Sequence, residues 1–151
     1  LIELLIVVAI LGILAAVGIP MYQGYQDTAK YNATRTNFSN ASSFIAAELT
    51  KCGISDIMHL KQTEGSGSTS FDCSALTSAE LGSKLVAHFG YDNWKNPYTS
   101  ENAVITGTPS KGDIKLTGST DSDIITITIT SIAYNPKTKS NETLTQALSL
   151  E

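Results

Sequence analysis

The chain has 151 residues, enough for one domain, and it is mildly acidic, with a formal net charge of −4 and a pI of about 5.1. This balance argues against nucleic acid as the default partner, because binding to a phosphate backbone depends on basic surface. The first twenty positions are almost wholly apolar, whereas the rest is rich in Ser, Thr, Asn and Gly. The asymmetry predicts a hydrophobic helix over residues 1–25 and a globular head over residues 26–151.

The N-terminal segment holds one charged side chain, Glu3, and no other before Asp27. The 21 residues from Leu4 to Gly24 are uncharged, and a helix of that length spans about 30 Å, the hydrocarbon thickness of a bilayer. A secretory signal peptide would need a basic region and a small-residue cleavage site, where this chain has Pro20-Met21-Tyr22. A plain single-pass anchor fits the length but leaves Glu3 unexplained.

The stretch LIELLIVVAILGILAA (residues 1–16), with Ile19-Pro20 and Tyr22 after it, resembles the N-terminal signature of type IV pilins and of the related type II secretion pseudopilins. This N-terminal match covers about 25 residues and depends on the spacing of one Glu, one Gly and one Pro. It implies that a prepilin peptidase cleaves the precursor. It also implies that the processed protein begins with an N-methylated Phe and one more residue before Leu1. We therefore expect that the sequence begins two residues into the processed protein.

The resemblance further implies a helical homo-oligomer. Members of this family wait in the lipid bilayer of the inner membrane until the pilus assembly machinery extracts them into an extracellular filament. There Glu3 is expected to pair with the N-terminal amine of a neighbour, at its Leu1 end, because an unpaired carboxylate near the bilayer centre costs about 2.5–3.5 kcal/mol. Gly12, Gly18 and Pro20 weaken a helix, and by resemblance they mark a segment that can lose helical structure and let the polymer lengthen.

A second helix segment is expected over residues 26–52. Apolar side chains recur there at intervals of three, four and seven, which is typical of a helix face packed against a core: Tyr31, Phe38, Ala41, Ile45, Leu49 and Cys52. The opposite face is polar and carries Asn32, Arg35, Asn40 and Glu48. Gly53 is the expected residue after the helix end.

The two cysteines, Cys52 and Cys73, are expected to form a disulfide, since the apolar N-terminus and polar body favour an extracytoplasmic head. Free buried thiols are the alternative. The bond would close the loop 52–73, of about 22 residues, and stabilise the head by roughly 3 kcal/mol.

A short helix is predicted over residues 78–89, because Thr77 and Glu80 form a capping-box pattern. The following turn, residues 90–98, is rich in Asn and Pro, and its Asp-x-Trp-x-Asn-Pro-Tyr spacing resembles a turn of major pseudopilins and some pilins. Trp94 and Tyr98 are expected to fill the seam between helix and sheet.

The C-terminal third, residues 103–150, is expected to form strands over 103–106, 113–117, 125–130 and 143–150. The clearest is ITITIT (residues 125–130), whose alternation predicts Ile toward the helix and Thr toward solvent. The predicted fold is therefore α+β, with a long N-terminal helix on an antiparallel sheet of three to four strands.

We expect no enzyme, no cofactor and no metal site. His59 and His88 lie far apart in sequence and are expected at the surface or partly buried. Asp121-Ser122-Asp123 resembles a calcium loop but offers too few of the six to eight oxygen ligands that calcium takes. Four N-x-S/T sequons, at Asn32, Asn37, Asn40 and Asn141, are weak glycosylation signals.

The leading interpretation is thus a type IV pilus subunit, and the alternative is a pseudopilin of a type II secretion system. The Trp94–Tyr98 turn favours the pseudopilin, whereas the disulfide argues mildly against it. In pilins the disulfide usually brackets the C-terminal segment, and Cys52–Cys73 lies earlier. The sequence leaves open whether a filament would serve adhesion, motility, secretion, DNA uptake or conduction, and it names no surface receptor.

Overall fold

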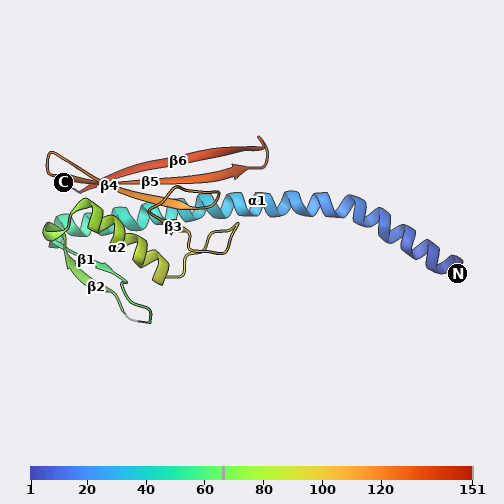
Figure 1. Ribbon diagram of the computed structural model, residues 1–151, viewed down its shortest axis with the longest axis horizontal. Helices are drawn as coiled ribbons and strands as arrows, with labels where there is room; N and C mark the ends of the chain where they lie inside the picture. Colours follow the sequence, from blue (N-terminus) through green and yellow to red (C-terminus); the bar gives the residue numbers. More distant parts are fainter. Residues whose placement is uncertain (66, 151) are drawn as a thin grey trace.

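The computed structural model describes residues 1–65 and 67–150. One helix, α1 (Ile2–Ser55, 54 residues), runs along the whole molecule, and the other elements gather around its C-terminal half (Figure 1). Every residue from 1 to 26 is exposed, so the N-terminal half of α1 projects from the head. The fold is α+β, as the sequence predicts.

The helix α1 passes through Pro20 without a break, although proline removes one hydrogen-bond donor there. It also continues past Cys52, where the sequence pattern placed its end. Gly53 lies inside the last turn, and Asp56 takes the left-handed conformation (φ 56°) while its N–H donates to Cys52 O at 3.0 Å. The prediction of Gly53 as the terminating residue is therefore wrong, because an aspartate also tolerates this conformation.

The main sheet has the order β3-β4-β5-β6 and covers one side of α1 (Figure 1). Its strands are β3 (Val104–Ile105), β4 (Ile114–Asp121), β5 (Ile124–Asn135) and β6 (Ser140–Leu150). Strands β4, β5 and β6 pair antiparallel, and only the two-residue β3 joins parallel, beside the start of β4. Ile127 and Ile129 are buried against α1, which confirms the side expected for the isoleucines.

A smaller hairpin lies inside the disulfide loop, where the sequence pattern indicated no strands. It pairs β1 (Ile57–Leu60) with β2 (Thr69–Asp72), and a 3-10 turn (Cys73–Ala75) follows. Met58 and Leu60 are both buried and belong to the main core. Their spacing of two residues was the available signal, but it was too short to indicate a strand by itself.

The second helix, α2 (Ser78–Tyr91), begins with the predicted capping box, in which Thr77 and Glu80 bond each other's backbone N–H. It packs against β4. A Cβ at Gly118 of β4 would lie 2.0 Å from Ser78 O, so only glycine permits this close approach of strand and helix. Between α1, α2 and the sheet lies one core, made by Ala41, Ile45, Leu49, Met58, Leu60, Leu81, Leu85, Phe89, Ile114, Leu116, Ile127 and Ile129.

Candidate assembly helix and the contacts of the head

The exposed half of α1 is the most unusual surface of the molecule. It presents large apolar side chains all round its axis, namely Leu1, Ile2, Leu4, Leu5, Ile6, Val7, Val8, Ile10, Leu11, Ile13, Leu14, Val17, Ile19, Met21, Tyr22 and Tyr25. The helix is long and apolar enough to cross a membrane. A signal sequence meets the same criterion, and so does the core helix of a soluble protein, but none of this apolar window is buried. A surface this apolar calls for a lipid or protein partner.

Glu3 lies in the first turn of α1, next to the Leu1 end of the chain. A carboxylate at a helix N-terminus is stabilised by the backbone dipole and the unpaired N–H groups there. Within the part of the chain that the structure describes, the ion pairs are those of Lys51 with Glu48 and of Lys61 with Asp92, and Glu3 takes part in neither. Its carboxylate therefore stands among apolar side chains, available to a group on another molecule.

Gly12, Gly18 and Pro20 all lie within the continuous helix. A Cβ at either glycine would meet nothing within 4 Å, so packing in the single chain does not require glycine at these positions. Each glycine lowers helix stability by about 1 kcal/mol relative to alanine. The two glycines therefore weaken this half of α1, and no contact within one subunit requires them.

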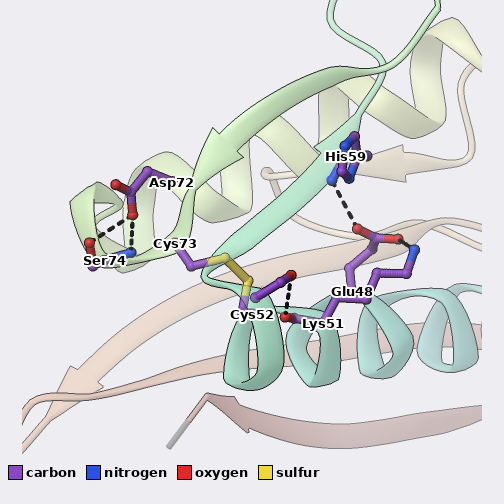
Figure 2. Close-up of a disulfide and its surroundings, with 8 residues drawn as sticks. Glu48, Lys51, Cys52, His59, Asp72, Cys73 and Ser74 are labelled. Carbon is purple, nitrogen blue, oxygen red and sulfur yellow. Dashed lines mark hydrogen bonds and ion pairs between the residues drawn. A yellow bond between two sulfur atoms is a disulfide. The ribbon is translucent and has the colours of Figure 1, made fainter.

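The far end of α1 is tied to the β1–β2 hairpin by covalent and polar contacts (Figure 2). The expected Cys52–Cys73 disulfide is present, with its Cα atoms 5.7 Å apart. One turn earlier, Glu48 pairs with Lys51 and accepts the backbone N–H of His59 at 3.0 Å. Glu48, which the sequence pattern assigns to the polar face of the helix, is only 3% exposed. Its polar partners compensate the burial, and sequence periodicity does not reveal them.

His59 is exposed, but His88 is buried in the head. The His88 ring stacks on Phe44 at 4.4 Å, and its Nδ1 accepts the backbone N–H of Lys61 at 2.9 Å. Burial lowers the pKa of His88, while the nearby Asp92 carboxylate opposes that shift. The hydrogen bond from Lys61 lowers the pKa of Asp92. His88 is therefore a neutral acceptor that holds the end of β1, a role that the sequence did not indicate.

The predicted turn over residues 90–98 is organised by Asn96, which is 1% exposed. Its Nδ2 donates to Lys111 O (2.9 Å) and to Asp113 Oδ1 (2.7 Å), and its Oδ1 accepts the N–H of Tyr98 (2.7 Å). Trp94 packs on Phe89 of α2 with ring centroids 4.7 Å apart, close to the predicted place between helix and sheet. The whole turn is thus fastened to the loop before β4.

The Asp121-Ser122-Asp123 segment is a tight hairpin turn between β4 and β5. Ser122 (φ 50°) and Asp123 (φ 68°) both take left-handed conformations, as a two-residue turn requires. Among residues 1–65 and 67–150, no group of three or more His, Cys, Asp or Glu side chains is placed to hold a metal ion. Both carboxylates of this segment, those of Asp121 and Asp123, are exposed at the end of the hairpin.

Comparison with known proteins gives no relative: no family model, no curated protein and no solved structure matches the chain. The long apolar helix on a small sheet, with its disulfide, is compatible with a pilin-like protein.

Proposed function

We propose that this chain is a structural subunit of an extracellular type IV pilus, held in the inner membrane before assembly. The observation that carries the proposal is the projecting half of α1, which is apolar on all sides and continuous with the helix packed in the head. Such a segment fits first a bilayer and then a bundle of identical helices, because both surround it with apolar atoms.

Glu3 gives the bundle its register. Apolar contacts are non-directional and allow many axial offsets between helices. A single carboxylate that pairs with the amine at the neighbour's Leu1 end permits one offset, and every other offset leaves a buried charge without a partner. Glu3 therefore acts on the order of the filament more than on the fold of the subunit.

The weakened stretch of Gly12, Gly18 and Pro20 fits the same function. It has no packing role in the single chain, and inside a filament it would be the first part of α1 to give up helical hydrogen bonds under tension. Extension at this stretch lengthens the polymer while the heads stay folded.

The test is electron microscopy of material sheared from the surface of cells that produce the chain. Filaments composed of this chain, lost in the Glu3→Gln variant and kept in the charge-conserving Glu3→Asp variant, are the expected result. The head of each variant should keep its disulfide and its melting temperature. Filaments of normal yield from Glu3→Gln would refute the pairing.

The second candidate function is that of a pseudopilin in a type II secretion system. The observation in its favour is the Asp92–Tyr98 turn around Asn96, whose spacing resembles a turn of major pseudopilins. Deleting the gene for this chain distinguishes the two functions. Loss of surface filaments indicates a pilus subunit, and a secretion defect in cells that never show surface filaments indicates a pseudopilin.

A further inference from the structure

The charges of the head separate along the direction of β5. This strand starts directly after the Asp121-Ser122-Asp123 turn and ends directly before the turn 136–139, which carries Lys137 and Lys139. These two turns are called here the acidic tip and the basic tip. All four charged side chains are exposed. Twelve residues of extended chain place the tips about 40 Å apart.

Neighbouring groups extend both charge patches. Beside the acidic tip, Leu150 of β6 pairs next to the start of β5 and shares a surface hollow with Asp56 and Ser74. The exposed Asp72 accepts the N–H of Ser74 at 3.0 Å, so its carboxylate lies at the same end of the head (Figure 2). The segments 55–57, 72–80 and 120–125 that form this end contain no lysine or arginine.

At the basic tip, the Lys111 ammonium lies over the ring of Tyr134, near the end of β5, at 4.5 Å from its centroid. Arg35 of α1 donates to the Tyr31 hydroxyl at 2.8 Å, and that hydroxyl donates to Glu142 at the start of β6 at 2.6 Å. Glu142 is thereby engaged within the chain, whereas both tip lysines point to solvent. The two ends of one head thus carry opposite charge.

We propose that the acidic tip of one subunit docks on the basic tip of a second copy, head to tail along the filament. The proposal rests on the proposed function and deepens it by naming the contact between heads. Strand β5 and α1 lie side by side along the length of the head (Figure 1). In a filament of parallel α1 helices, a neighbour displaced by about 40 Å along β5 brings its basic tip to the acidic tip of the first subunit.

This contact joins two different surfaces, so it does not close on itself. Each added subunit leaves one acidic tip free at one end and one basic tip free at the other, and the contact propagates into an open polymer. Opposite charges on exposed tips guide the encounter and disfavour an inverted neighbour, since inversion brings like charges together. The contact complements the helix bundle. The bundle holds the centre of the filament together, and the tip contact determines which heads lie next to one another.

The test uses full-length chain in the cells that produce it. Asp121→Lys and Lys137→Glu change exposed residues whose φ values are not left-handed, so neither strains its turn. Each single variant cancels the net charge of its own tip, since Asp123 or Lys139 keeps the original sign. It is expected to lower the yield of sheared, pelleted filament about tenfold, because the attraction between the tips is lost. The combination of both exchanges provides an exchanged pair of opposite charges, one on each tip at positions 121 and 137, and should recover part of the yield. Glu64→Lys, an exposed change away from both tips, is the control and should assemble normally.

A cysteine pair locates the contact directly. The native cysteines are bonded to each other, so Thr120→Cys with Thr138→Cys adds the two thiols available for oxidation. Oxidised filaments should then give a ladder of covalent multimers, whereas either single cysteine should not.

The outcomes separate the two proposals. Filaments of normal yield from both single charge variants overturn the tip contact and leave the pilus function standing. Folded single variants that fail while the combination also fails overturn it as well. If Lys137→Glu instead reduces the binding of the chain to anionic phospholipid vesicles and leaves filament assembly unchanged, the basic tip faces a membrane and the proposed tip contact is wrong. A complete lack of filaments from the unchanged chain overturns the pilus function and the contact together.

Discussion

Gly82 and Gly118 face each other where α2 crosses β4, and alanine at the two positions should act in opposite directions. A Cβ at Gly118 would lie 2.0 Å from Ser78 O and 2.6 Å from Ser78 C, both of which are backbone atoms at the start of α2. A Cβ at Gly82 would meet Gly118 N at 3.8 Å, an ordinary contact. The methyl group of Gly118→Ala therefore forces β4 and α2 apart, whereas the methyl group of Gly82→Ala fits between them.

The magnitudes follow from these distances. Gly118→Ala requires α2 or β4 to shift, and overpacking of this kind costs about 1–3 kcal/mol. Gly82→Ala replaces a glycine inside a helix and should raise the free energy of unfolding by about 0.8–1.0 kcal/mol. For a head of this size, 1 kcal/mol changes the melting temperature by about 3 °C.

The assay is thermal unfolding of the full-length chain in detergent, followed by the fluorescence of Trp94, the only tryptophan, which packs on Phe89 of α2. We expect Gly118→Ala to melt below the unchanged chain and Gly82→Ala above it. A Gly118→Ala variant as stable as the unchanged chain would mean that α2 and β4 are not in this close contact. Destabilisation by Gly82→Ala would mean that they are closer still.

Three further predictions concern the head. Cys73→Ser should lower the free energy of unfolding by roughly 3 kcal/mol, because it removes a cross-link between residues 21 positions apart; an unchanged urea midpoint would contradict this. Asn96→Ala should cost about 2–4 kcal/mol in the same titration, since it leaves buried partners of the amide unbonded, and a loss below that range would show that water replaces the amide. Because burial lowers the pKa of His88 below its usual 6.5, the folded head binds fewer protons there than the unfolded chain, and stability present above pH 6.5 should fall as the pH drops below it. His88→Phe should flatten this slope in melting temperatures taken from about pH 7.5 to about pH 5; an identical slope in the variant would assign the dependence to another group.

The elements with strong local signals could be predicted from the sequence. The apolar run predicted the N-terminal half of α1, Thr77 and Glu80 marked the start of α2, and the Ile-Thr alternation identified β5 and its buried side. Strands β4, β5 and β6 are longer than expected, since pairing with their neighbours extends β4 to Asp121 and β5 to Asn135, whereas β3 is shorter than expected. Pairing of this kind is decided between strands and leaves little trace within either one.

The features that were missed depend on contacts between distant residues. Periodicity placed Glu48 on the polar face of the helix and gave no sign of its burial, which depends on a hydrogen bond from the backbone N–H of His59. The burial of His88 depends on Phe44, which belongs to another helix. The strands of hairpin β1–β2 are too short for their alternation to indicate a strand, and the adjacent disulfide holds the hairpin against α1.

The uninterrupted course of α1 has a mechanical consequence. With 54 residues in one helix, about 80 Å long, no connecting loop separates the projecting half of α1 from the head. While α1 stays helical throughout, the head cannot rotate independently of the projecting half, so a twist imposed on that half turns the head with it. In the filament proposed above, rotation of the intact helices and the orientation of the heads would therefore be coupled.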